Sequence, residues 1–334
     1  MCGKIQQIKR GMIINMKKYF FYLFIGLISL GNLCAQERAG SSFQVVPLGI
    51  KGGLDESNLS SYLVAPAGSR DFICADAGTV RHGIDIAIQN KVFRGSADEV
   101  LKNQVKGYLI SHPHLDHVAG LLMNSPEDSP KNIYAIPSVV DVLKDKYFTW
   151  KAWANFTNEG ELPHLNKYTY VYLQQHTKQQ LANTQMEVTP FILSHGSSYQ
   201  STAFLIGHKD TYLLYLGDTG ADSIEKSTYL AQLWNKIAPL VRNNQLKAIL
   251  IEVSFPDEQP EKQLFGHLTP KLLMNELEQL NQLTNLEALR KVPIVITHMK
   301  AFGKQEITLK NELKQRNQLG LKLVFPKQGK MMNF

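Results

Sequence analysis

The side chains most able to do chemistry lie in one short segment, Ser111–His117, which reads Ser-His-Pro-His-Leu-Asp-His and directly follows an apolar run. Alternate side chains of an extended chain point the same way, so His112 and His114 can bind at one point. Asp116 and His117 can then turn toward a second point nearby. Imidazole and carboxylate groups without thiolates suit Zn²⁺, Mn²⁺ or Fe²⁺ with open positions for water. A polar loop with chance histidines is the plain alternative, and three histidines in six positions argue against it.

Three further candidate ligands follow other apolar runs, each at the end of a segment that we expect to be a strand. These are His195, Asp218 in a Gly-Asp-Thr-Gly turn, and His298. Two metal ions about 3.5–4 Å apart need more ligands than one segment supplies. A lone histidine or a Gly-Asp turn is weak support by itself. Together, and each at a strand end, they predict a metal site on one edge of a sheet.

Strands and helices alternate along the part of the chain that must position these residues. The strands are expected at 43–50, 62–65, 72–75, 107–110, 168–173, 187–193, 203–207, 212–216, 248–253, 293–297 and 321–325. Helices are expected at 98–105, 139–153, 224–241 and 270–290. Short strands rich in β-branched and aromatic residues, with helices between them, indicate a layered α/β or α+β architecture. We expect one domain over residues 36–334.

We expect the N-terminal residues 1–35 to be a targeting segment rather than part of the folded domain. Met16 is followed by two lysines, an apolar run of about 15 residues and the small residue Ala35, as in a secretory signal peptide. A membrane span needs roughly 20 apolar residues, so an anchor is the weaker alternative and we expect no stable span in the mature chain. Met16 is the expected start, and the mature protein is expected to be secreted or periplasmic.

The charge of the remaining chain is close to neutral. Five of the 36 Lys and Arg residues and none of the 29 Asp and Glu residues lie in residues 1–35, which leaves 31 against 29. This balance gives no reason to expect nucleic acid as a partner. Cys74 is the one cysteine beyond residue 35, so a disulfide framework and a cysteine-rich zinc site are excluded.

The ordered set His112, His114, Asp116, His117, His195, Asp218 and His298 resembles the ligands of metallo-β-lactamase-fold hydrolases. The longer string from His112 to Pro126, with Gly266–Pro270 and Ile296–Lys300, is similar to the class II 3′,5′-cyclic-nucleotide phosphodiesterases. The resemblance implies an α+β fold of the αββα sandwich type with two divalent metal ions, Zn²⁺ by default and Mn²⁺ or Fe²⁺ as alternatives.

In that family resemblance the ligands divide into two groups with a shared carboxylate. His112, His114 and His195 would hold one metal ion. Asp116, His117 and His298 would hold the other, and Asp218 would bridge the two. Asp76 would orient the loops of the site rather than bind metal.

The implied reaction is hydrolysis of cAMP or cGMP to a nucleoside 5′-phosphate by attack of a metal-bridging hydroxide. We assign catalytic roles to Asp116, through its metal, and to His267, as donor of a proton to the leaving 3′ oxygen. A phosphate contact or a local cap is the alternative role for His267. Glu252, at a strand end, is the candidate partner that orients it.

Other functions remain as alternatives. A hydrolase of the same fold could instead be a lactonase, a thioesterase or a β-lactamase, although Cys74 is poorly placed for a thiolate-containing lactamase site. A nuclease acting on tRNA is disfavoured by the neutral charge and the signal segment. A non-catalytic metal-binding or adhesion domain is the alternative outside enzymes. Base preference, the metal and the oligomeric state are left open.

Several remaining aromatic residues have ordinary explanations. We expect a surface or hydrogen-bonding role for the histidines at positions 82, 164, 176 and 208. Trp150 and Trp153 lie on a segment whose default role is packing, and a lid that stacks on the base is the alternative.

Overall fold

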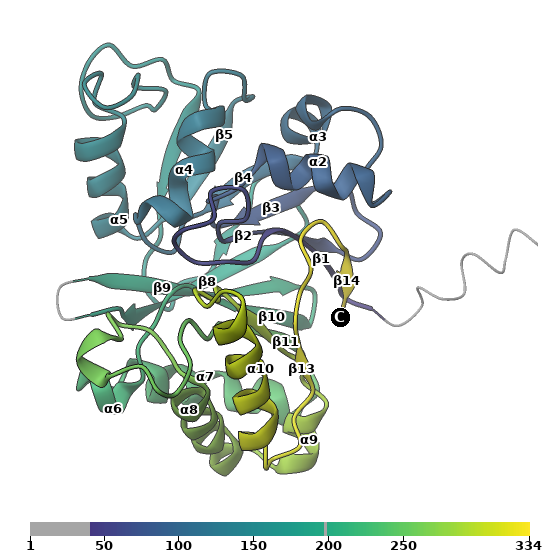
Figure 1. Ribbon diagram of the computed structural model, residues 1–334. Coiled ribbons are helices and arrows are strands. Elements are labelled where there is room, and N and C mark those ends of the chain that lie inside the picture. The colour runs from purple at the N-terminus through teal and green to yellow at the C-terminus, as the bar shows by residue number, and fades with distance from the viewer. Residues whose placement is uncertain (1–40, 197–198) are drawn as a thin grey trace, which may run out of the picture. The chain divides into compact units, whose positions relative to one another are not determined.

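Two seven-stranded sheets form the centre of the structure, a computed structural model that describes residues 41–196 and 199–334 (Figure 1). The segment that we expect to be a signal peptide lies outside the described residues. The first sheet has the order β14-β1-β2-β3-β4-β5-β6, and the second has the order β13-β12-β11-β10-β9-β8-β7. The expected α+β sandwich is therefore confirmed.

The strands of the first sheet are β1 (Phe43–Gly49), β2 (Ser61–Pro66), β3 (Phe72–Ala75), β4 (Val105–Leu109), β5 (Lys131–Ala135), β6 (Tyr168–Tyr172) and β14 (Met332–Asn333). Those of the second are β7 (Gln179–Gln180), β8 (Glu187–Ser194), β9 (Gln200–His208), β10 (Thr211–Leu216), β11 (Leu246–Glu252), β12 (Ile294–Thr297) and β13 (Leu323–Val324).

The helices are α2 (Arg81–Gln89), α3 (Ala97–Asn103), α4 (Leu115–Asn124), α5 (Pro137–Val142), α6 (Asp222–Glu225), α7 (Tyr229–Arg242), α8 (Pro270–Leu283), α9 (Leu286–Arg290) and α10 (Lys304–Arg316). A π-helical turn, η2, continues α5 over Leu143–Tyr147, and a 3₁₀ turn, η3, covers Glu261–Gln263. None of the helices in the described ranges combines the length and the apolar character that a membrane crossing requires.

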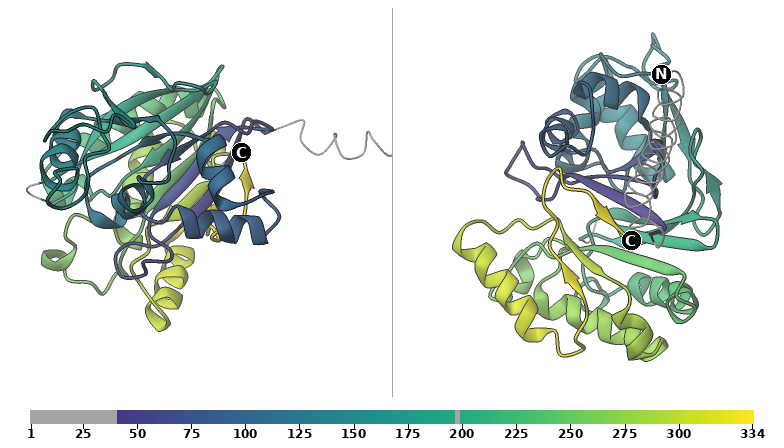
Figure 2. Two further views of the ribbon diagram at one scale, coloured as in Figure 1. Left: turned by 90° about the horizontal axis from the view of Figure 1, so that it is seen from above. Right: turned by 90° about the vertical axis from the view of Figure 1, so that its right-hand side faces the viewer.

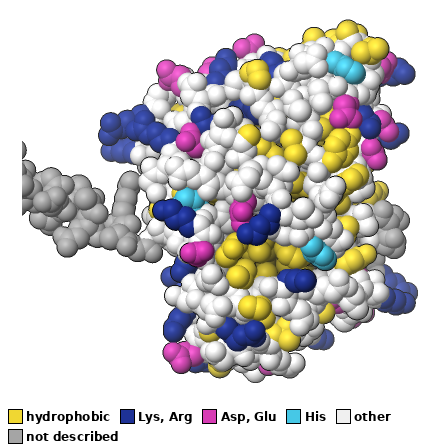
Figure 3. Space-filling model, turned by 180° about the vertical axis from the view of Figure 1, so that it is seen from behind, with side chains coloured by type: hydrophobic (Ala, Val, Ile, Leu, Met, Phe, Trp, Pro, Cys, Tyr) yellow, Lys and Arg dark blue, Asp and Glu magenta, His cyan; other side chains and the backbone are white. Residues whose placement is uncertain are grey.

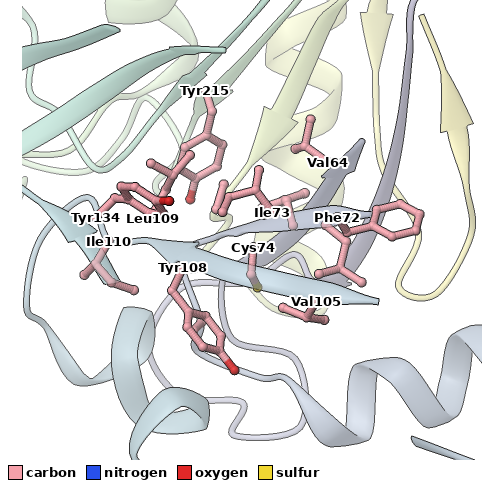
Figure 4. Packing of buried hydrophobic residues seen from close by; sticks show 14 of the residues in the cluster. Val64, Phe72, Ile73, Cys74, Val105, Tyr108, Leu109, Ile110, Tyr134 and Tyr215 are labelled. Atoms are coloured by element: carbon pink, nitrogen blue, oxygen red, sulfur yellow. The ribbon is translucent and has the colours of Figure 1, made fainter. Parts of the chain in front are cut away.

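Each sheet is covered by its own helices on the side away from the other sheet. Helices α2 to α5 lie over the first sheet and α6 to α10 over the second, and both views in Figure 2 show the same layering. The first core joins the two sheets and extends to α2 to α5, and the second lies between the second sheet and its helices. In Figure 4 Leu109 of the first sheet and Tyr215 of the second lie side by side, while Tyr108 leaves β4 on the opposite side.

Strand direction brings one set of strand ends together. Strands β3 and β4 are parallel in the first sheet, and β10, β11 and β12 are parallel in the second. Strand β8 runs in the same direction as β10, because both are antiparallel to β9. The carboxyl ends of these strands therefore meet at one edge of the sandwich. Residues beyond the strand ends are not paired with a neighbouring strand, so polar groups can lie there.

The expected strands are all present, but strands β5, β7 and β14 were not expected, and the other differences lie in the helices. The segment 111–117, for which no helix was expected, enters α4, with extended backbone at His114 and the backbone N–H of His117 bonded to the His114 carbonyl at 2.9 Å. The single helix expected at 270–290 is two, because the Asn285 side chain accepts a 2.8 Å hydrogen bond from Ala288 N and caps a new helix.

The helix expected over 139–153 ends early. Its last turn is π-helical and stops at Tyr147, and Trp150 adopts a positive φ of 61°. Trp153 packs against the first core and donates a 2.9 Å hydrogen bond to Ser125 Oγ, and Trp150 donates to the Pro163 carbonyl at 2.9 Å. Trp153 thus has the expected packing role, whereas Trp150 is 41% exposed. On the face shown in Figure 3, basic and acidic side chains are interspersed among apolar ones.

Candidate metal centre

All seven expected ligands come together at the shared edge of the two sheets. His112 and His114 follow β4, and Asp116 and His117 lie in the first turn of α4. The other three lie directly after strands: His195 after β8, Asp218 beyond β10 and His298 after β12. Four of the seven are buried histidines, and His298 has a positive φ of 53° that turns it back toward the site.

The first group consists of His112, His114 and His195. Nδ1 of His114 lies 3.1 Å from Nε2 of His112 and 3.3 Å from Nε2 of His195. One ligand atom from each residue lies within 4.8 Å of the others. The three nitrogens therefore point at one common position.

The second group consists of Asp116, His117, Asp218 and His298. Nε2 of His117 lies 3.0 Å from Nε2 of His298, and Oδ2 of Asp116 lies 3.1 Å from the same His298 nitrogen. Asp218 Oδ2 lies 3.3 Å from His117 Nε2 and 3.2 Å from His298 Nε2. The same oxygen is 3.7 Å from His112 Nε2 and 3.9 Å from His195 Nε2, so Asp218 lies between the two groups.

The hydrogen bonds at the outer nitrogens of the histidines determine which ring nitrogen carries the proton. Nδ1 of His117 faces Asp76 Oδ2 at 2.8 Å, and Nδ1 of His195 faces the Gly266 carbonyl at 2.9 Å. Both partners only accept, so each Nδ1 carries the proton and donates. Nε2 of each ring is left with its lone pair directed inward.

Two serines fix two further rings in the same way. Ser111 Oγ donates to Asp76 at 2.7 Å, so it accepts from Nδ1 of His112 at 3.0 Å. Ser254 Oγ donates to Glu252 Oε2 at 2.6 Å, so it accepts from Nδ1 of His298 at 3.1 Å. Four imidazole nitrogens whose protons are held on the outer side and two carboxylates therefore converge, and a cation satisfies such a set. The residues fit divalent metal ions on this ground.

Burial and charge complement this arrangement. Burial lowers the pKa of His112 and His195, and it lowers the pKa of His114 to about 4. These rings are neutral at neutral pH, which is the form that binds metal. Burial also acts on His117, but the negative charges of Asp218, Asp76 and Asp116 outweigh it and raise the pKa of that ring. The second group therefore attracts positive charge.

Among the described residues, the buried Asp76 carboxylate is hydrogen-bonded to one member of the ligand set, His117. Its carboxylate accepts from Ser111 N at 2.8 Å, Ser111 Oγ at 2.7 Å and Tyr215 OH at 2.6 Å. These contacts fit the orienting role expected for Asp76. Tyr215 was not singled out by the sequence, although it lies three residues before Asp218.

His267 lies between the two groups. Its ring stacks on His298 with centroids 5.4 Å apart and packs edge-on against His195 at 4.9 Å. Nδ1 of His267 lies 2.7 Å from Glu252 Oε1, the partner expected for it, and 3.8 Å from Asp218 Oδ2. Glu252 also accepts from Thr219 N at 3.0 Å and from Ser254 Oγ. It therefore accepts a hydrogen bond from the Nδ1–H group of His267 as well, and Nε2 of His267 is left to give or take a proton.

Two residues of the site, Ser254 and Gly52, are not marked by any motif in the sequence. Ser254 joins Glu252, His267 and His298 through one hydroxyl. Gly52 lies so close to His298 that a β-carbon on it would be 2.2 Å from Cε1 of that ring. The other four histidines lie apart from the cluster, as expected.

Solved structures with the same architecture identify the fold. Unliganded yeast PDE1 aligns with a TM-score of 0.77 at 24% identity, over 88% of this chain and all of that one. The metallo-beta-lactamase fold protein YhfI from Bacillus subtilis aligns with a TM-score of 0.57 at 17% identity, over 87% of this chain and 99% of that one. The fold is the metallo-β-lactamase fold, as the resemblance implied.

Sequence similarity identifies the family to which the chain belongs within this fold. Residues 96–329 match the cAMP phosphodiesterases class-II. The chain is 40% identical to a 3′,5′-cyclic-nucleotide phosphodiesterase of Aliivibrio fischeri, over 88% of this chain and 93% of that protein. It is 36% identical to a probable 3′,5′-cyclic-nucleotide phosphodiesterase of Yersinia pestis, over 88% and 90%. The chain belongs to the class-II cyclic-nucleotide phosphodiesterase family, and it is an enzyme of that class.

Proposed function

We propose that this enzyme hydrolyses cAMP, cGMP or both to nucleoside 5′-phosphates at a site that holds two divalent metal ions. The observation that carries this proposal is the convergence of imidazole lone pairs and carboxylates around Asp218, in a chain of this family. The position of Asp218 Oδ2 between the two groups, 3.2–3.9 Å from four histidine nitrogens, supports two ions rather than one.

The ligand assignment follows the two groups. His112, His114 and His195 would hold one ion; Asp116, His117 and His298 would hold the other; Asp218 would contribute to both. Zn²⁺ suits this set, and Mn²⁺ or Fe²⁺ are the alternatives. When bound, the ions would activate water as a nucleophile and neutralise charge on the phosphate oxygens.

The protein itself would supply the proton for the leaving group. In the reaction the oxygen of one water molecule forms a new bond to phosphorus, and the bond from phosphorus to the 3′ oxygen breaks. The 3′ alkoxide is a poor leaving group, so a positioned acid accelerates its departure. His267 is the residue that we assign to this step, because Glu252 fixes its tautomer and Nε2 is left able to carry the proton.

The proposed location of the enzyme is outside the cytoplasm, in the periplasm or the medium. It is supported by the basic residues after Met16 and by the apolar run that follows them. A reporter active only outside the cytoplasm, fused to residues 16–40, should become active. An inactive fusion that stays in the cytoplasm would contradict the proposal.

The decisive experiment combines kinetics with elemental analysis on one sample. We expect turnover of cAMP or cGMP to the 5′-monophosphate, with about two metal ions per chain. A thioester, a lactone and a cephalosporin, tested in parallel, should be poor substrates. A 3′-monophosphate product, a single bound ion, or turnover of only the thioester, lactone or cephalosporin would overturn the proposal.

Removal of the metal gives a second test that does not depend on turnover. A chelator should abolish activity and lower the melting temperature, and Zn²⁺ should restore both. Binding to the native state alone stabilises a protein by about 2.7 kcal/mol at a ligand concentration 100 times Kd. A melting temperature that does not respond to chelation would contradict a metal site of this kind.

A further inference from the structure

A cavity of about 580 Å³ opens beside the first histidine group. Its wall includes Pro113, which lies between His112 and His114, and Ser194 and Gly196, which flank His195. The volume is within the range of about 300–1,000 Å³ that is usual for small-molecule sites. Because these three wall residues are chain neighbours of proposed metal ligands, the cavity is the candidate place for the base of a cyclic nucleotide whose phosphate lies at the metal site.

Tyr199 gives the cavity an aromatic surface. Its side chain is 56% exposed, and its ring packs edge-on against His114 with centroids 4.9 Å apart. An exposed aromatic ring held against a proposed metal ligand is placed to stack on a base. Stacking does not select among bases, because every base has a π face.

Glu225 gives the cavity a hydrogen-bonding edge. Its Oε2 accepts a 2.9 Å hydrogen bond from Ser194 Oγ, and the carboxylate packs closely on Gly220, where a β-carbon would be 2.4 Å from Oε1. Within the described residues Glu225 forms no salt bridge with a basic side chain. The wall of the cavity thus presents a fixed carboxylate that can accept further hydrogen bonds but cannot donate.

The chemistry of a carboxylate favours one purine. Guanine presents two adjacent donors, N1–H and the 2-amino group, which match two carboxylate oxygens. Adenine presents one donor beside the acceptor N1, whose lone pair would face the carboxylate. An acceptor-only group therefore pairs with guanine and repels part of the adenine edge.

We infer that this cavity binds the base of the substrate, that Tyr199 stacks on it, and that Glu225 reads the guanine edge, so that the enzyme prefers cGMP to cAMP. This inference rests on the proposed function and names the specificity residue of the same site. It assigns Glu225 to recognition of substrate and not to the reaction.

The test compares kcat/KM for cGMP and cAMP in the wild type, Glu225→Gln and Glu127→Gln, with bis(p-nitrophenyl) phosphate as a substrate without a base. Glutamine still accepts from Ser194, so the cavity is preserved. We expect Glu225→Gln to lower kcat/KM for cGMP about 10- to 100-fold, the range of one bidentate base contact. The value for cAMP should stay the same or rise, because a carboxamide matches adenine. Glu127 is an exposed control, with a side chain 75% accessible.

Binding of product supplies a second readout. Calorimetry should show that the wild type binds 5′-GMP more tightly than 5′-AMP and that Glu225→Gln loses the difference. Tyr199→Ala should weaken both products alike, and Tyr199→Phe should restore them. Equal losses for both nucleotides in Glu225→Gln, as for a contact to the shared ribose, would overturn the inference, and so would a wild type that prefers cAMP. A wild type that hydrolyses neither nucleotide would instead refute the proposed function.

Discussion

Oδ2 of Asp76 lies 2.8 Å from Nδ1 of His117, and the same oxygen accepts a hydrogen bond from Tyr215 OH at 2.6 Å. One buried carboxylate thus joins the end of β3, the first turn of α4 and strand β10 of the second sheet. It fixes the tautomer of a candidate ligand and ties the two sheets together beside the site. The residue has a positive φ of 51°, so its backbone is held in a sparsely populated conformation by these contacts.

Replacing Asp76 with Ala should weaken metal binding without removing a ligand. His117 would lose the partner that orients its ring, and changes of this kind cost about 10- to 100-fold in metal affinity or activity. Metal titration and kcat/KM measure the effect, with Asp210→Ala in the exposed turn between β9 and β10 as control. An Asp76→Ala protein that folds and binds metal with unchanged affinity would contradict the orienting role.

Gly52→Ala should impair the site by steric displacement alone. The new β-carbon would lie 2.2 Å from Cε1 and 2.5 Å from Nδ1 of His298, so the ring has to move. Gly52 does not have a positive φ, so the substitution adds no backbone strain. A misplacement of about 1 Å can reduce the rate by about 10²-fold. The effect is measured as kcat together with metal content, and Glu56→Ala on the same loop is the control. A Gly52→Ala protein with the kcat of the wild type would show that activity does not depend on this position of the His298 ring.

Much of this site could be predicted because its ligands follow strands. Each of His195, Asp218 and His298 directly follows a short apolar run or its turn, and the ends of parallel strands meet at one sheet edge. The helix α4 was missed because the residues that begin it look like a ligand loop. The buried Val118, Leu121 and Leu122 have helical spacing and could have indicated it.

Contacts between residues distant in the sequence could not be predicted. Strand β14 has two residues and pairs with β1 almost 290 positions earlier, so no local pattern marks it. Gly52 and His298 likewise become neighbours only in the folded chain. Ser254 is an ordinary serine until folding places its hydroxyl among Glu252, His267 and His298.

Asp128→Ala should destabilise the fold without removing a candidate ligand. The Asp128 carboxylate is buried and accepts from Tyr108 OH at 2.6 Å and Tyr168 OH at 2.8 Å, and it pairs with the buried Lys131 Nζ at 2.7 Å. Removing one partner of a buried ion pair costs about 3–5 kcal/mol of unfolding free energy. Urea unfolding measures it, and Asp141→Ala, which breaks an exposed pair with Lys144, should cost below about 1 kcal/mol.

The destabilisation in Asp128→Ala should also depend on pH. Burial lowers the pKa of Lys131 even in the wild type, and the loss of Asp128 lowers it further. Between the lowered pKa of Lys131 in the folded variant and the ordinary lysine pKa of about 10.4, the unfolded state binds more protons than the folded state, so stability rises with pH in that window. The difference from the wild type should therefore be smaller at pH 9.5 than at pH 7. A difference that grows with pH would show that Lys131 is not the source of the penalty.

His267→Ala should separate proton donation from metal binding. We expect kcat on cAMP or cGMP to fall about 10²- to 10⁴-fold, the usual contribution of a general acid, with metal content unchanged. Bis(p-nitrophenyl) phosphate releases a phenolate that needs no proton, so its hydrolysis should fall much less. Glu252→Gln should show the same pattern to a smaller degree, because it loosens the 2.7 Å contact that fixes the ring. His82→Ala, on the exposed surface, is the control. Equal losses on both kinds of substrate would assign His267 to phosphate binding instead, and loss of metal would make it a ligand.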